Sequence, residues 1–192
     1  GTRGGAGCRV GTTCRPMKRV VIADAGPLIA LARLGQLAWL PRLFGKVHVT
    51  PWVASELVVG GEFPESSVLR EALAQPWLET VDLAEQGLTD WEPSSREWMH
   101  LHQVDPGEAT ALAWASHLAA HGDAPLLVMD DFRARAAAGH ARLPVVGTAG
   151  LLLLARQNGM VTAVRPWLER LRSQGYYLSD ALIEAVATQA GE

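Results

Sequence analysis

The sequence is organised around short apolar runs that alternate with segments of helical periodicity. The apolar runs cover residues 19–23 (RVVIA), 46–49, 126–129 and 143–146, and a weaker one covers residues 77–81. Short runs of this kind are typical of strands that are buried on both faces of a parallel sheet. Repeated strand–helix alternation therefore predicts an α/β protein whose parallel sheet is covered by helices on both faces.

Helical patterns fill most of the segments between the predicted strands. They cover residues 28–34, 68–74, 109–119, 133–138, 151–157, 164–171 and 180–188, and one more helix runs from Pro51 to a stop near Gly60 and Gly61. Thr50 before Pro51 is a strong helix start, and Thr148 and Ser179 are predicted to cap the helices that follow them. Residues 82–103 show little periodicity, and no helix is predicted there.

After Pro16, no linker, repeat or low-complexity segment divides the sequence. Residues 17–192 are therefore predicted to form a single domain that includes the C-terminal helices. Residues 1–16 are Gly-rich and basic and stand directly before Met17, so we expect a disordered leader or an expression scar. This segment also holds both cysteines, and their absence elsewhere suits a reducing, cytoplasmic environment.

Charge and hydropathy argue against a protein with a broad basic surface and against a membrane-spanning protein. The formal net charge of −3 argues against a broad basic coat for nucleic acid, although it leaves room for a local basic patch. No apolar run reaches the roughly 18 residues that a membrane-spanning helix needs, so we expect no membrane association.

Acidic residues stand where a parallel sheet places its ligand site. Asp24 ends the first predicted strand, the pair Asp130 and Asp131 ends a central one, and Glu56 and Glu108 lie near the starts of helices. Open parallel sheets bind ligands at the carboxyl ends of their strands, so these five carboxylates form the candidate site.

Carboxylates that converge repel one another, and some take up protons unless a cation neutralises them. Oxygen ligands without Cys or His favour Mg²⁺ or Mn²⁺ over zinc. Such a cluster suits phosphodiester hydrolysis, in which one ion activates water and another stabilises the leaving 3′ oxygen.

Each acid also has a purely structural interpretation. Asp24 is well placed to cap the helix after it, and Glu108 has the spacing of a capping box with the aspartate three residues earlier. Glu56 alone is typical of a solvated helix surface. One of Asp130 and Asp131 is expected to cap the next helix while the other faces the site.

Four motifs carry a family likeness. They are VIADAGPLIAL (21–31), PWVASEL (51–57), DPGEATALA (105–113), and LLVMDDFRARAAA (126–138) with VVGTAGLLLLA (145–155). In order and spacing they resemble the motifs of the PIN-domain family, most closely its VapC-like prokaryotic ribonuclease branch. The likeness spans roughly residues 19–160.

This resemblance implies a three-layer α/β/α fold with a central parallel sheet, and Mg²⁺- or Mn²⁺-dependent endoribonuclease activity on single-stranded RNA. It also implies that Asp24, Glu56, Glu108 and one or both of Asp130 and Asp131 ligate metal or orient metal-bound water. A toxin role with a small antitoxin as partner is a further implication. The chain is longer than a typical toxin and has two aspartates at the last motif where many relatives have one.

Several polar side chains are candidates for substrate contacts. Arg133, Arg135 and Arg142 follow the acidic pair and are placed either to hold RNA phosphates or to lie on a solvated helix surface. Thr148 offers a hydroxyl to a phosphate or serves only as a helix cap.

Histidine and apolar positions leave further alternatives open. His100 and His102 have strand-like spacing, while His117 and His121 share one helix face, where they are either surface residues or a metal-binding pair. The apolar positions of the last two helices are expected to dock on the domain or on a partner, and we expect a homodimer.

Two alternatives compete with the nuclease: a different activity on a similar sheet, and a non-catalytic binding role. A phosphatase of the dehalogenase type needs an Asp-x-Asp motif after the first strand, where this chain has Asp24-Ala25-Gly26, and a receiver domain needs a lysine near its acids. A non-catalytic protein that uses the same fold to bind a partner is the second alternative. Retention of every acidic position argues against it.

Overall fold

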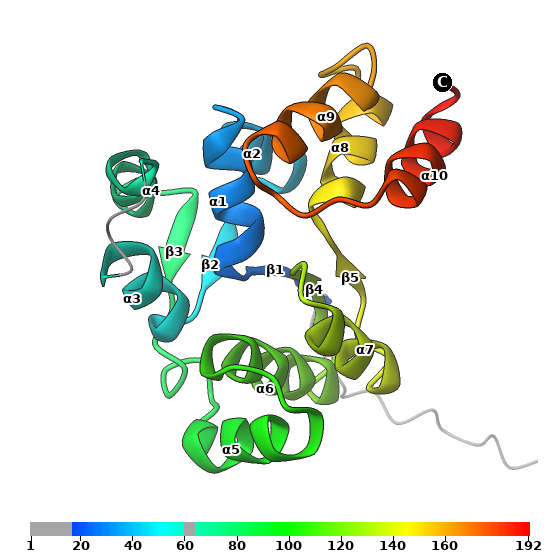
Figure 1. The fold of residues 1–192 in the computed structure, drawn as a ribbon. Helices are drawn as coiled ribbons and strands as arrows, with labels where there is room; N and C mark the ends of the chain where they lie inside the picture. Colours follow the sequence, from blue (N-terminus) through cyan, green and yellow to red (C-terminus); the bar gives the residue numbers. More distant parts are fainter. Residues whose placement is uncertain (1–16, 60–63) are drawn as a thin grey trace, which may run out of the picture.

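The computed structural model describes residues 17–59 and 64–192. The expectations for residues 1–16 and for the helix stop at Gly60 and Gly61 lie outside the described residues. The described chain forms a central sheet with helices packed on both sides (Figure 1).

The sheet contains five described strands, all parallel. They are β1 (Arg19–Ala23), β2 (Val47–Val49), β3 (Leu78–Thr80), β4 (Ala124–Val128) and β5 (Val145–Val146). Their order across the sheet is β3-β2-β1-β4-β5, and Ala23 pairs with Val128 at the carboxyl end of the central pair. The chain thus winds outward in one direction from β1 and in the other from β4. Such a reversal of strand order opens a crevice at the carboxyl ends of β1 and β4.

Ten helices are assigned in the described residues. They are α1 (Ala25–Arg33), α2 (Trp39–Phe44), α3 (Pro51–Val59), α4 (Ser66–Leu73), α5 (Trp91–His102), α6 (Pro106–Ala120), α7 (Phe132–His140), α8 (Thr148–Gln157), α9 (Arg165–Ser173) and α10 (Asp180–Ala190).

Alternation along β1 separates two apolar cores. Val21 and Ala23 face a core built with α1, α2, α8 and the C-terminal helices. Val20 and Ile22 face the opposite core, built with α6 and α7. Since successive side chains of a strand point to opposite faces, both faces of the sheet are covered. The predicted three-layer α/β/α fold is therefore confirmed.

Two helices lie where none was predicted. α5 falls in the segment of weak periodicity, and of its twelve residues only Ser95 is fully buried. Trp98 and Met99 are half-buried against the core beside α6, so the apolar stripe is too narrow to mark the helix in the sequence. His100 and His102 belong to this helix, and their strand-like spacing was misleading. α2 is only six residues long and carries Pro41 inside it.

The helix starts at residues 50 and 179 are confirmed. The side-chain oxygen of Thr50 accepts a hydrogen bond from the amide of Val53 at 3.4 Å, and that of Ser179 accepts from the amide of Leu182 at 3.2 Å. The predicted cap at Thr148 is wrong, because Gly147 holds the N-cap position of α8 and the Thr148 side chain has another partner, described below.

The C-terminal helices pack on the domain itself. Leu168 and Leu171 of α9 and Ile183 and Val186 of α10 are buried in the core that includes α1 and α8. None of the helices in the described ranges is long and apolar enough to cross a membrane.

The close approach of α8 to β5 yields a stability test. A Cβ atom added at Gly150 would lie 2.5 Å from Cγ2 of Val146, whereas one at Gly139 in α7 would meet no atom within 4 Å. We expect Gly150→Ala to lower the free energy of unfolding by about 1–3 kcal/mol through overpacking. Gly139→Ala should leave it unchanged or raise it by up to about 1 kcal/mol. Urea denaturation of both variants provides the measurement, and equal effects would contradict this packing.

Candidate active site

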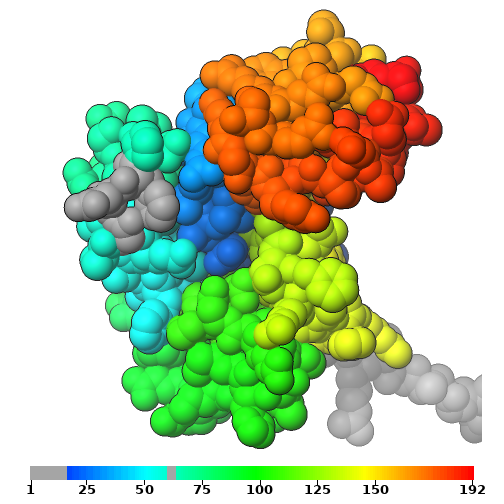
Figure 2. Space-filling view, in the orientation of Figure 1, coloured from blue at the N-terminus to red at the C-terminus, as the bar shows by residue number. Residues whose placement is uncertain are grey.

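The crevice lies where the strand order reverses. Figure 2 shows a hollow whose floor is formed by the N-terminal part of the chain, between the segments drawn in green and in orange. The amide of Asp24 donates to the carbonyl of Val128 at 2.9 Å, which continues the β1–β4 ladder to the edge of the sheet. A Cβ atom at Gly26 would lie 3.8 Å from Oδ2 of Asp24 and 4.0 Å from Oδ2 of Asp130. The two carboxylates therefore flank Gly26 at the carboxyl ends of the central strands.

Asp24 is a buried acid whose side chain interacts with the backbone amides of Ala25 and Gly26 but with no cationic group among the causes of its pKa shift. It holds the N-cap position of α1, but its side chain makes no capping hydrogen bond, and only 9% of the residue is exposed. Burial is the main cause that raises the pKa of Asp24 to about 7, with smaller contributions from the charges of Asp105 and Glu56 and an opposing effect of the backbone amides of Ala25 and Gly26. The simple capping role is thus not the one this side chain performs.

Glu108 combines a structural and an electrostatic role. Its Oε2 accepts from the amide of Asp105 at 3.0 Å, and the Asp105 side chain accepts from the amide of Glu108 at 2.8 Å. The predicted capping box is therefore present at the start of α6. Burial nevertheless raises the pKa of Glu108 to about 7, and the charges of Asp105, Asp131 and Asp24 add to this rise. Glu108 is held in place by the cap while it remains part of the acidic cluster.

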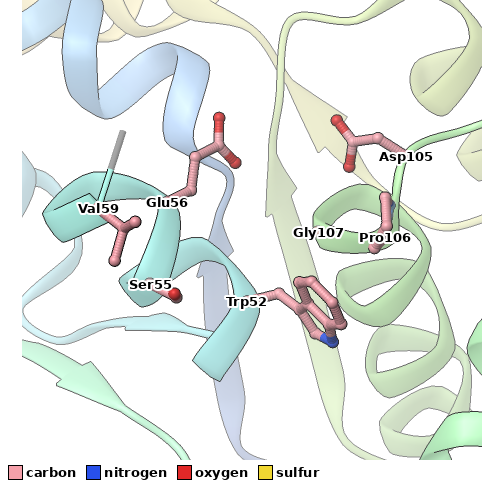
Figure 3. Close-up of a pocket in the computed structure, with 7 residues that line it drawn as sticks. All are labelled: Trp52, Ser55, Glu56, Val59, Asp105, Pro106 and Gly107. Atoms are coloured by element: carbon pink, nitrogen blue, oxygen red, sulfur yellow. The ribbon is translucent and has the colours of Figure 1, made fainter. Parts of the chain in front are cut away.

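Glu56 and Asp105 face each other across a pocket. Figure 3 shows Glu56 on α3 and Asp105 at the start of α6 pointing toward one another, with Trp52 and Gly107 on the pocket lining. The pKa of Glu56 is raised first by desolvation and then by the charge of Asp105. Sequence analysis had given Asp105 only a capping role. The spacing of three residues between Asp105 and Glu108 could have indicated that both carboxylates lie together at the start of α6.

Asp130 and Asp131 have different hydrogen-bond partners. Oδ1 of Asp131 accepts from the amides of Arg133 at 2.7 Å and Ala134 at 2.9 Å, so Asp131 caps α7. Oδ1 of Asp130 accepts from the amide of Thr148 at 2.7 Å, and its Oδ2 accepts from the Thr148 hydroxyl at 2.6 Å. Asp130 is thereby fixed at the floor of the crevice, as one member of the pair was expected to be.

Tyr176 is a site residue that the sequence did not reveal. Its hydroxyl donates to Oδ2 of Asp130 from the segment between α9 and α10, 46 residues further along the chain. Burial raises the pKa of the Tyr176 hydroxyl, and the charge of Asp130 raises it further, so the phenol stays protonated as a donor. No motif pointed to this contact, because only the docking of the C-terminal helices creates it.

The three candidate arginines have different surroundings. Arg133 donates to the carbonyl of Gln103 at 3.4 Å, while a Cβ atom at Gly147 would lie 3.0 Å from Nη1 of Arg135. Arg142 is exposed and has a left-handed backbone conformation, with φ at 57°.

His117 and His121 lie with ring centroids 4.2 Å apart, and the Nδ1 atom of His121 hydrogen-bonds to the carbonyl of His117.

Comparison with known proteins identifies the family. A family model described as a PIN domain matches residues 20–192. The chain belongs to the PIN-domain family. PIN domains are generally nucleases that use divalent metal ions, which indicates a nuclease-type function for this chain. No curated protein matches the chain.

The acids of this PIN domain match a hard cation in their chemistry. All the donors are carboxylate oxygens, and burial and mutual repulsion raise the pKa values of Asp24, Glu56 and Glu108. A divalent cation would relieve both costs. Within residues 17–59 and 64–192, however, no group of three or more His, Cys, Asp or Glu side chains lies close enough together to coordinate one metal ion. The chemistry of the donors therefore fits a hard divalent cation, although the carboxylates are not arranged as a preformed metal site.

The raised pKa of Asp24 predicts a pH dependence of stability. The unfolded chain releases this proton near pH 4 and the folded chain near pH 7, so the free energy of unfolding should fall as pH rises across this window. We expect Asp24→Asn to flatten this decline and to exceed the wild type by at least about 1 kcal/mol at pH 8 in chelator. Mg²⁺ should stabilise the wild type and not the variant.

Urea denaturation at pH 5 and pH 8 tests this expectation. Glu85→Gln, at an exposed position, serves as the control for removal of one negative charge. An Asp24→Asn protein that is less stable than the wild type at pH 8 in chelator would show that the carboxylate has a stabilising partner.

The Tyr176 contact predicts a second difference in stability. Tyr176→Phe removes a hydrogen bond to a carboxylate and should lower the free energy of unfolding by about 1.5–3 kcal/mol. The adjacent Tyr177 is 92% exposed, so Tyr177→Phe should have no measurable effect. Chemical denaturation in chelator compares the two variants, and the idea fails if both behave like the wild type.

Proposed function

We propose that this PIN domain is a Mg²⁺- or Mn²⁺-dependent endoribonuclease that hydrolyses phosphodiester bonds of single-stranded RNA. The observation that supports this most is the convergence of Asp24, Asp130 and Glu108 at the crevice between β1 and β4, where burial and the charges of neighbouring carboxylates raise the pKa values of Asp24 and Glu108. Buried carboxyl groups that crowd one another at a ligand crevice are costly for folding and useful for holding a cation.

The residues that would hold the cations are Asp24, Glu108 and Asp130, with Asp105 beside Glu108 at the start of α6 and Glu56 facing Asp105 from α3. Asp131 supports them through the cap of α7, and its charge reaches Glu108. Bound divalent cations supply Lewis acidity and a more acidic water. Asp130 is oriented by Thr148 and Tyr176, and Glu108 is oriented by the amide of Asp105.

Hydrolysis adds water across the P–O3′ bond. The water oxygen bonds to phosphorus, the P–O3′ bond breaks, the 3′ oxygen leaves with a proton, and the phosphate stays on the 5′ end of the other product. In the metal-free protein the pKa values of Asp24 and Glu108 are about 7, so binding of a cation would release the protons that these groups hold at neutral pH. Arg133 and Arg135, which follow the acidic pair in α7, are the residues that we expect to contact phosphates. The Thr148 hydroxyl acts toward substrate through Asp130, since it already donates to that carboxylate.

The biological setting forms a further part of the proposal. The motifs favour the VapC-like branch, and a small antitoxin would be the partner that masks the acids. We also propose a homodimer that acts in the cytoplasm, where the lack of cysteines after Cys14 is expected.

Cleavage of a labelled single-stranded RNA panel tests the activity. The wild type should cleave with Mg²⁺ or Mn²⁺ and not in chelator, and Asp24→Asn should abolish cleavage. Asp130→Asn and Asp131→Asn form a matched pair, because asparagine also caps helices well. We expect Asp130→Asn to lose at least about 100-fold in rate, in the range found for removal of a group that stabilises charge in the transition state. Asp131→Asn should retain most activity.

A folded wild-type protein that binds Mn²⁺ by calorimetry yet cleaves no RNA with either metal would favour the alternative. The chain would then be a non-catalytic PIN-domain protein that acts through a partner.

A further inference from the structure

A second pocket adjoins Asp130 on the side away from Glu56. The first pocket lies between α3, which follows β2, and α6. The second pocket lies at the opposite end of the sheet edge, beside β5 and α8, with α10 as its outer wall. Its volume is about 380 Å³, within the range of pockets that accept small ligands. A strand that crosses the acidic crevice would therefore have one pocket on each side.

The second pocket contains a cationic side chain, that of Arg135, near the carboxylate of Asp130. Arg135 is exposed, lines the pocket and forms no salt bridge with any carboxylate of the described residues. Gly147 leaves the space that its guanidinium occupies, because a Cβ atom there would lie 3.0 Å from Nη1. A guanidinium beside a carboxylate-lined crevice is suited to a phosphate that the carboxylates themselves repel.

The rim of the second pocket offers an aromatic ring to solvent. Tyr177 lines the pocket and is 92% exposed, whereas its neighbour Tyr176 is turned inward to Asp130. Leu182 contributes apolar surface that is 40% exposed, and Gln189 contributes an amide that is able both to donate and to accept. An aromatic face together with a polar amide suits a nucleobase.

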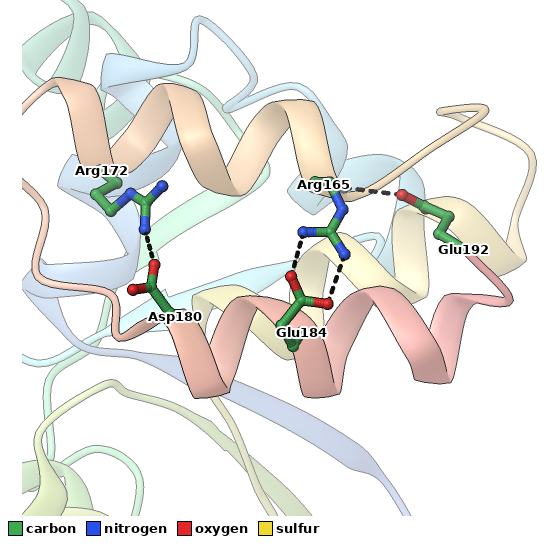
Figure 4. Close-up of polar contacts among 5 residues, drawn as sticks. All are labelled: Arg165, Arg172, Asp180, Glu184 and Glu192. Atoms are coloured by element: carbon green, nitrogen blue, oxygen red, sulfur yellow. Dashed lines mark hydrogen bonds and ion pairs between the residues drawn. The ribbon is translucent and has the colours of Figure 1, made fainter.

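The outer wall of this pocket is held rigidly. Figure 4 shows α9 and α10 joined by ion pairs between Arg165 and Glu184 and between Arg172 and Asp180. The Glu192 side chain also accepts from the amides of Val164 at 2.6 Å and Arg165 at 3.2 Å at the start of α9. The backbone of the segment that carries both tyrosines is thus held between two helices that are joined to each other.

We propose that this second pocket binds one nucleotide of single-stranded RNA next to the scissile phosphate, with the base stacked on Tyr177 and its phosphate on Arg135. The proposal rests on the proposed nuclease function and adds to it the position where one flanking nucleotide lies. Stacking on a side chain requires an unpaired base, so the pocket also accounts for a preference for single strands over duplexes.

Fluorescence anisotropy of the full chain with a 5′-fluorescein RNA decamer, in chelator, measures binding without cleavage. Tyr177→Ala should raise Kd at least fivefold, the lower end of the effect of removing a stacking ring, while Tyr177→Phe should bind like the wild type. Arg135→Gln should raise Kd and reduce the salt slope by about one. The same decamer in a duplex should bind more weakly than the single strand.

Two exposed residues that do not line the second pocket provide matched controls. Phe132→Ala removes a ring that is 83% exposed, and Arg142→Gln removes a cation near the end of α7. Both should bind RNA like the wild type, and melting temperatures should match across the whole set.

The proposal is overturned if Tyr177→Ala and Arg135→Gln bind as tightly as the wild type, or if the wild type binds no single-stranded RNA. Active wild-type enzyme with unaltered binding by both variants rejects the pocket and leaves the nuclease standing. Binding that depends on both residues, without cleavage in either metal, supports the pocket and rejects the nuclease.

Discussion

The crowding of carboxyl groups between β1 and β4 is the constraint on which this structure depends. Because the strand order reverses there, the loops after the two strands diverge and leave a crevice that the apolar cores do not fill. Asp24 occupies this crevice almost without exposure and with a pKa of about 7. A fold that only needed stability would place an apolar or neutral residue there. Keeping a carboxyl group at this position therefore costs the fold stability.

The acids around Asp24 differ in how firmly they are held. Thr148 and Tyr176 donate to Asp130, and the amide of Asp105 donates to Glu108, so these two carboxylates are fixed before any ligand arrives. Asp24 has no comparable side-chain cap. Groups that are already fixed lower the entropic cost of assembling a site. Asp24 is held less firmly, and its raised pKa means that it would gain most from a bound cation. This division explains how one crevice is both ordered and electrostatically unsatisfied.

The sequence predicted most of the sheet and its acidic edge, because buried strands and helix starts are local patterns. The RVVIA run, the start at Thr50 and the capping box at Glu108 each depend on neighbouring residues alone. α5 was missed because its buried stripe is narrow, and Thr148 was misassigned because its partner Asp130 lies 18 residues earlier. Which of the two final aspartates faces the site was likewise decided by a contact between separate elements.

Tyr176 shows why the C-terminal helices belong to the site and not merely to the scaffold. The motifs that suggested the family end near residue 160, yet the family match continues to residue 192. α9 and α10 bury their apolar faces against α8, and that docking carries the Tyr176 hydroxyl to Asp130. A change that loosens α10 would therefore act on the acidic crevice through the hydrogen bond between Tyr176 and Asp130 and through the pocket wall that α10 forms beside Asp130. The packing of the C-terminal helices and the geometry of the site are thus coupled.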